Sequence, residues 1–109
     1  VLAEALWIEL GHHGVDVLAV VAGLTDTPAM RSSGMLMDAT SFQPMSPDDV
    51  ADEALGALGR GTPMLVVGAE NRKMAEMLWP VPRADLVEAM SAASAALYGL
   101  VPLERPAAR

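Results

Sequence analysis

The fold of this chain is decided by the stretch Val15-Asp16-Val17-Leu18-Ala19-Val20-Val21, followed directly by Ala22-Gly23-Leu24-Thr25-Asp26-Thr27-Pro28. Residues 15–21 are rich in β-branched side chains and almost continuously apolar. Runs of this kind are typical of strands that are buried on both faces of a parallel sheet. The sequence therefore predicts such a strand over residues 15–21, with a long loop beginning at its carboxyl end.

A second apolar run, Pro63-Met64-Leu65-Val66-Val67, predicts another buried strand that stops at Gly68. Between the strands, Ser46-Pro47-Asp48-Asp49 predicts the start of a helix, because Ser caps, Pro suits the first turn and acids favour the positive helix end. Apolar spacing and helix-breaking residues predict helices over residues 2–10, 29–33, 46–58, 70–78 and 84–98. Strand, helix, strand in this order predicts a parallel pair with a right-handed crossover.

The two predicted strands need neighbouring strands and covering layers that the sequence does not supply. Two parallel strands alone cannot cover both faces of a sheet or close its two edges. Position 1 is Val, and no capping residue precedes the helix expected from Leu2. We therefore expect an α/β fold in which residues 1–109 form the C-terminal part of a larger domain, with a frayed tail over residues 102–109.

The amino-acid composition limits which binding partners and which cellular locations are expected. With 7 basic and 14 acidic residues the net charge is −7, so the chain repels phosphate backbones and no nucleic-acid partner is expected. The absence of cysteine excludes disulfides and thiolate metal sites, and a reducing, cytoplasmic location is the default expectation. No apolar run approaches the roughly 18 residues that a membrane span needs. Glu4 and Glu9 interrupt the first apolar stretch, which does not resemble a signal peptide.

The loop that begins at Ala22 is the part of the sequence that most favours a ligand site. In open α/β sheets, ligands bind beyond the carboxyl ends of the strands. Gly23 permits close approach to the backbone, and Thr25 and Thr27 offer hydroxyls and amides. A plain turn with local threonine hydrogen bonds is an equally good interpretation. The methionines of the loop likewise either line an adaptable apolar site or pack into the core: Met30, Met35, Met37 and Met45.

Three other patterns favour structural interpretations. Gly56, Gly59 and Gly61 approach a dinucleotide fingerprint, but they close a helix and lead into a strand, whereas a phosphate loop leaves a strand and opens a helix. His12 and His13 are adjacent, so their side chains diverge, and they suit a negative helix end better than a shared metal. An acidic cluster could suggest a cation site, but an acidic N-terminal turn on a solvated helix face explains it better; its members are Asp48, Asp49, Asp52 and Glu53. No metal site is therefore predicted.

Short motifs along the chain also form a recognisable series. In chain order they are Leu2-Ala3-Glu4-Ala5-Leu6-Trp7, Glu9-Leu10, Gly14-Val15-Asp16-Val17, Ala22-Gly23, Thr27, Ser46-Pro47-Asp48-Asp49-Val50-Ala51 and Gly59-Arg60-Gly61. Over roughly residues 1–70 this series resembles the short-chain dehydrogenase/reductases, and the likeness is weaker beyond. The motifs are modest one by one and fairly specific in this order and spacing.

The resemblance implies a Rossmann-type doubly wound parallel sheet, of which this chain would supply the last two strands with their flanking helices. It implies that NAD or NADP contacts Ala22, Gly23, Leu24, Thr25 and Thr27, although Ala22 stands where the family has Pro. Thr25 would offer its backbone to the nicotinamide carboxamide, and Thr27 would contact the nicotinamide end. Residues 22–45 would form a loop that covers cofactor and substrate, with a substrate lid that includes Met30, Met35 and Met37.

The resemblance further implies an NAD(P)-dependent oxidoreductase that transfers a hydride to or from a small alcohol or carbonyl substrate and is homo-oligomeric when intact. The family's Gly-rich loop and catalytic Ser, Tyr and Lys have no counterpart here, and no Lys follows Tyr98 at the required spacing. No catalytic residue is therefore assigned, and the chain alone is expected to be inactive. The alternative is a non-catalytic, truncated α/β interaction module that pairs through its apolar surfaces.

Overall fold

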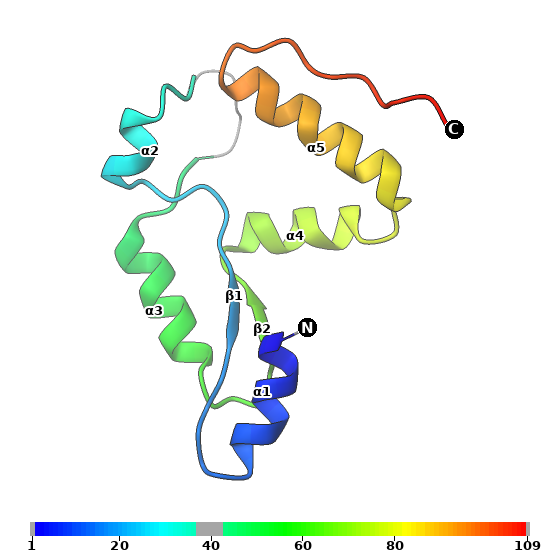
Figure 1. The fold of residues 1–109 in the computed structure, drawn as a ribbon. Coiled ribbons are helices and arrows are strands. Elements are labelled where there is room, and N and C mark those ends of the chain that lie inside the picture. Colours follow the sequence, from blue (N-terminus) through cyan, green and yellow to red (C-terminus); the bar gives the residue numbers. More distant parts are fainter. Residues whose placement is uncertain (1, 37–42, 109) are drawn as a thin grey trace.

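The computed structural model describes residues 2–36 and 43–108, and within them α-helices accompany a small parallel sheet (Figure 1). The strands are short and lie side by side in the middle of the molecule. In chain order the elements are α1 (Leu2–Gly11), β1 (Ala19–Val21), α2 (Pro28–Ser32), α3 (Pro47–Ala57), β2 (Met64–Val66), α4 (Ala69–Leu78) and α5 (Arg83–Leu97). The general α/β class is confirmed.

The sheet has two strands, and β1 pairs with β2 in parallel, with Ala19 opposite Met64 and Val21 opposite Val66. Both strands are shorter than predicted, since residues 15–18 have no ladder partner. The physical reason is that residues 58–61, which precede β2, form a turn and therefore offer residues 15–18 no strand to pair with. Gly59 and Gly61 have φ of +75° and +83° in this turn, which are left-handed conformations that suit glycine. The ladder therefore begins only where the Ala19 N–H donates to Pro63 O at 2.9 Å.

The helix boundaries follow the sequence signals closely. Ser46 caps α3, because its Oγ accepts the Asp49 N–H at 3.1 Å, and Pro47 occupies the first turn. Helix α5 begins just after Pro82 and ends at Leu97, close to the predicted range. The predicted helix starts and ends near residues 47, 57 and 78 are confirmed to within one residue or two.

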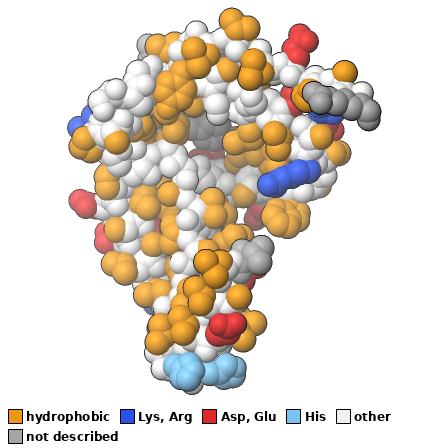
Figure 2. All heavy atoms as spheres, viewed as in Figure 1, with side chains coloured by type: hydrophobic (Ala, Val, Ile, Leu, Met, Phe, Trp, Pro, Cys, Tyr) orange, Lys and Arg blue, Asp and Glu red, His pale blue; other side chains and the backbone are white. Residues whose placement is uncertain are grey.

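The expectation that both strands are buried on both faces is wrong. Val67 is the one buried hydrophobic residue of the described chain, whereas Val20 and Val21 in β1 are 42% and 47% exposed. Figure 2 shows hydrophobic side chains over much of the visible face. The physical reason is that the described helices do not form complete layers over the sheet. The chain consequently keeps the apolar composition of a buried strand at positions that are open to water.

Two global measures agree with this incomplete coverage. The radius of gyration is 16.8 Å, against about 13 Å for a compact domain of this length. The solvent-accessible surface is 8250 Å², against roughly 5,800 Å² for a compact monomer of 11.4 kDa. The excess, roughly 2,500 Å², exceeds the area that one partner contributes to an ordinary protein interface.

The predicted frayed tail is only partly free. Residues 101–108 have no regular secondary structure and are exposed. Arg105 nevertheless donates from Nη2 to Asp85 Oδ1 at 2.6 Å and pairs with Glu88 Oε2 at 2.7 Å. These two carboxylates lie on α5, so the tail is attached to that helix by an exposed charge pair.

The small core makes stability depend on few side chains. Replacing Val67 with Ala removes two methyl groups from a fully buried position and should lower the free energy of unfolding by about 1.5–3 kcal/mol. Val101→Ala is the matched control, because Val101 is 87% exposed and its truncation should change stability by less than about 0.5 kcal/mol. Urea denaturation followed by circular dichroism measures both. Equal midpoints for the two variants would contradict the position of the core.

Candidate functional site at the carboxyl ends of the strands

The two ends of the loop that follows β1 are hydrogen-bonded to each other. The Met45 N–H donates to Leu24 O at 2.9 Å, and the Asp26 N–H donates to Met45 O at 2.8 Å. These bonds form a parallel bridge between Thr25 and Met45 just beyond the carboxyl end of β1. The predicted covering loop, residues 22–45, is therefore closed at its base by backbone hydrogen bonds, and a short helix, α2, lies within it.

Both threonines of the predicted cofactor site make local hydrogen bonds. Thr25 Oγ1 donates to Gly23 O at 3.2 Å, so its hydroxyl hydrogen is already engaged. Thr27 Oγ1 accepts the Met30 N–H at 3.2 Å and caps α2. A hydroxyl that accepts one bond still has a hydrogen to donate. Thr27 can therefore cap α2 and donate to a ligand at once, whereas the Thr25 hydroxyl can only accept from one.

The charged pair beside these threonines is a surface feature. Arg31 donates from Nε and Nη2 to the two carboxylate oxygens of Asp26, at 2.7 and 2.9 Å. The hydrogen bond from Arg31 lowers the pKa of Asp26 below its ordinary value. Both side chains are largely exposed, so the pair holds the start of α2 in place without contributing much to stability.

Two of the three predicted lid methionines lie within the described residues. Met30 and Met35 are half-buried. The next residue, Leu36, donates its N–H to Leu97 O at the last residue of α5, at 2.5 Å. Met37 lies outside the described residues. The segment after α2 is therefore anchored to the end of α5.

Gly23 is a glycine because another side chain occupies the space above it. A Cβ built on Gly23 would lie 2.5 Å from Asn71 Nδ2 and 2.8 Å from Asn71 Oδ1. Asn71 is fixed there, because its Nδ2 donates to Val67 O at 2.8 Å. Gly23 does not have a positive φ. The need for glycine is therefore steric, and Asn71 imposes it.

A second glycine stands at the corresponding point after β2. Gly68 has a φ of +90°, which favours glycine, and a Cβ there would lie 2.8 Å from Met45 Sδ. Its N–H donates to both carboxylate oxygens of Glu53, at 3.3 and 3.2 Å. Gly68 thus connects β2 to α3 through a charge-assisted hydrogen bond and also makes room for the residue that closes the loop.

Arg72 completes the arrangement around Glu53. Its Nη1 donates to Glu53 Oε1 and also to Val66 O, the latter at 3.0 Å. The hydrogen bond from Arg72, followed by that from the Gly68 N–H, lowers the pKa of the Glu53 carboxyl below its ordinary value of 4.5. We call the following group of residues the strand-end cluster: Gly23, Met45, Glu53, Gly68, Asn71 and Arg72.

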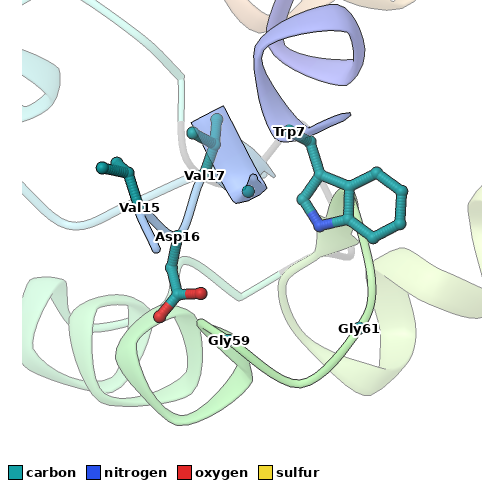
Figure 3. A pocket seen from close by; sticks show the side chains of 7 residues that line it. Trp7, Val15, Asp16, Val17, Gly59 and Gly61 are labelled. Carbon is teal, nitrogen blue, oxygen red and sulfur yellow. The ribbon is translucent and has the colours of Figure 1, made fainter. Parts of the chain in front are cut away.

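A separate hollow lies at the opposite end of the sheet, beside the turn that precedes β2 (Figure 3). Its volume is about 200 Å³, and its lining residues are Trp7, Gly11, Val15, Asp16, Val17, Gly59 and Gly61. Ligand pockets usually measure about 300–1,000 Å³. The hollow is thus small, and it lies away from the carboxyl edge at which open α/β sheets bind ligands.

Residues 2–36 and 43–108 contain neither a cluster of metal ligands nor a helix that could cross a membrane. No group of three or more His, Asp or Glu side chains is placed to hold a metal ion. None of the described helices combines the length and apolar character needed to cross a membrane. His12 and His13 lie together just beyond the end of α1, at the lower tip of the molecule in Figure 2.

The strand-end cluster was only partly visible in the sequence. The sequence predicts Gly23 at this edge and Met45 in the loop that follows it, whereas Glu53 is predicted in a solvated helix turn, and Asn71 and Arg72 give no signal. The hydrogen bonds of Glu53 join residues 15 and 19 positions apart, to Gly68 and Arg72. Comparison of the chain with protein-family models, curated proteins and solved structures finds no match.

The steric role of Asn71 is testable by a double-mutant cycle. Gly23→Ala should destabilise the chain by about 1–3 kcal/mol, because the new methyl would overlap the Asn71 amide. In an Asn71→Ala background the same change should cost little, giving a coupling energy of about 1 kcal/mol or more. Gly56→Ala is the control, since Gly56 lies inside α3 with open space around its Cα. Additive effects of Gly23→Ala and Asn71→Ala would exclude the contact.

The charge of Glu53 should appear as pH-dependent stability. Its pKa is lowered in the folded chain, so its contribution is complete above about pH 4.5 and disappears as the pH falls through the folded-state value. Glu53→Gln should lower the melting temperature at neutral pH, and the difference from the unmodified chain should vanish in acid. Glu76→Gln is the control, because Glu76 is an exposed carboxylate on α4. A temperature difference independent of pH would show that the Glu53 charge is not involved.

Proposed function

We propose that this chain is the C-terminal part of an NAD(P)-dependent oxidoreductase similar to the short-chain dehydrogenase/reductases, and that residues 22–27 form one wall of its nicotinamide site. The observation that carries the proposal is the position of this segment. It leaves the carboxyl end of β1 directly, and the parallel bridge to Met45 holds it there. That edge is where open parallel sheets bind nucleotide cofactors.

The donor set of the segment suits an amide ligand. Thr27 keeps a hydroxyl hydrogen that can be donated to a carbonyl oxygen, because its bond with Met30 uses only a lone pair. Thr25 would contribute its backbone groups and the acceptor lone pairs of its hydroxyl, since the hydroxyl hydrogen is donated to Gly23 O. Asn71 covers Gly23 on one side, so a carboxamide would approach from the side of Thr25 and Thr27. When bound, the cofactor would supply the hydride chemistry, and these residues would orient it.

The covering segment fits the same proposal. Met30 and Met35 are half-buried, and the N–H of Leu36 is bonded to the end of α5. Flexible, polarizable methionine side chains in this position would close an apolar alcohol or carbonyl substrate against the nicotinamide. No residue of the chain is assigned to proton transfer, so catalysis would require groups from the rest of the longer protein.

A second function is favoured by a different observation. The chain exposes roughly 2,500 Å² more surface than a compact monomer of its mass, and several of the exposed side chains are large and apolar. A non-catalytic interaction module would use this surface to bind another polypeptide. One measurement distinguishes the two functions, namely whether nicotinamide cofactors shift the amide resonances of residues 22–27.

We predict that NAD or NADP, titrated into the isotopically labelled chain, shifts the amide resonances of residues 22–27 before those of any other segment. Binding should be weak, because this chain lacks the Gly-rich loop that would hold the pyrophosphate. The spectra should show no turnover of cofactor with any alcohol. Unchanged resonances at residues 22–27 up to saturating cofactor would overturn the proposal.

In the same titration, Thr27→Val should weaken cofactor binding several-fold to about tenfold, equivalent to the loss of one hydrogen bond worth about 0.5–1.5 kcal/mol. It should also lower thermal stability, because Thr27 caps α2. Thr27→Ser is the matched control, since it retains the hydroxyl and both of its roles. A Val variant that loses stability but binds cofactor normally would assign Thr27 to capping alone.

A further inference from the structure

The side-chain amide of Asn71 lies between the ends of the two strands. Gly23 and Gly68 are each the second residue after a strand, and α4 begins beside the segment that leaves β1 (Figure 1). A Cβ built on Gly23 would lie 2.5 Å from Asn71 Nδ2, and one built on Gly68 would lie 3.1 Å from the same atom. A single amide therefore fills the space that a side chain at either strand end would need.

The buried end of the sheet holds this amide in place. Asn71 Nδ2 donates to Val67 O at 2.8 Å, and the Val67 side chain is fully buried. The Val67 N–H in turn donates to Val21 O at 3.0 Å, which continues the parallel ladder. A side chain that is fixed by packing and by a hydrogen bond can hold its neighbour precisely. Asn71 thus connects the end of the ladder to Gly23, near the start of the segment 22–27.

The same junction between β2 and α4 supports the segment at a second point. The Asp26 N–H donates to Met45 O at 2.8 Å, so Met45 holds the middle of the segment 22–27. The Met45 side chain rests against Gly68, because a Cβ there would lie 2.8 Å from Met45 Sδ. The segment is therefore held through Met45 and through Asn71, and every one of these contacts joins residues of this chain.

We propose that Asn71 is a positioning residue for the nicotinamide wall, residues 22–27. The proposal rests on the function proposed above. By filling the space beside Gly23, the Asn71 amide fixes the direction in which the wall leaves β1, and with it the direction of the Thr27 hydroxyl. Without the amide, Gly23 would regain the wide conformational freedom of glycine. The wall would then have to be ordered when the cofactor binds, at a cost in affinity.

Amide hydrogen exchange of the chain without cofactor tests the positioning role. In Asn71→Ala the Asp26 N–H, which is bonded to Met45 O, should exchange about tenfold faster or more relative to the Val67 N–H of the ladder. A merely structural role would accelerate both amides together, because both would then exchange through unfolding of the whole chain. Glu70→Ala is the control, since Glu70 is the exposed neighbour of Asn71 on α4, and it should leave the ratio of the two rates unchanged.

A second variant, Asn71→Asp, nearly keeps the size of the side chain and replaces the N–H donor with an oxygen beside Val67 O. It should change the ratio of the two exchange rates in the same direction. An unchanged ratio in both variants would overturn the positioning role.

Titration with NAD or NADP then tests the link to the cofactor. Both Asn71 variants should weaken the binding seen at residues 22–27 several-fold, whereas Glu70→Ala should bind as the unmodified chain does. Unchanged resonances in the unmodified chain would overturn the proposed function itself, together with any cofactor role of Asn71. Normal cofactor binding by both Asn71 variants would overturn the role of Asn71 alone.

Discussion

The parallel ladder between β1 and β2 is the contact on which the rest of the structure depends. It brings Ala19 beside Met64 and Val21 beside Val66, and the strand-end cluster lies at its carboxyl end. Closing so long a crossover costs conformational entropy, and two short strands recover only part of it. The chain compensates at the carboxyl end, where Arg72 joins the Glu53 carboxylate of α3 to the Val66 carbonyl of β2.

The elements of the fold could be predicted from the sequence because their signals are local. Ser46 followed by Pro47 starts a helix through chemistry confined to one turn, and the predicted start was confirmed to the residue. Burial could not be predicted in the same way. An apolar, β-branched run such as residues 15–21 indicates a strand that needs packing layers on both faces of the sheet. It does not indicate whether those layers are present. The pattern was therefore correct about the strand direction and wrong about its coverage.

Only those parts of the candidate site could be predicted whose location follows from their position after a strand. Residues 22–27 follow a parallel strand, so their place at the carboxyl edge could be inferred without coordinates. The reason for Gly23 could not, since it depends on an amide that lies far away in the sequence, at Asn71. Thr27 shows a related ambiguity, because one hydroxyl can cap a helix and donate to a ligand, and the sequence pattern is the same for both roles.

The side chains that cover the β2 edge have a consequence for solubility. Sheets aggregate into fibres when every copy of the chain has two strand edges that can pair. Each copy that is added then exposes a new edge, to which the next copy can bind. In this chain Thr62 Oγ1 donates to Met64 O and Arg72 Nη1 donates to Val66 O, so two carbonyls of the β2 edge already accept hydrogen bonds. Another strand then pairs less readily with this edge, and these two side chains limit how far an apolar, incompletely covered sheet can aggregate along its strands.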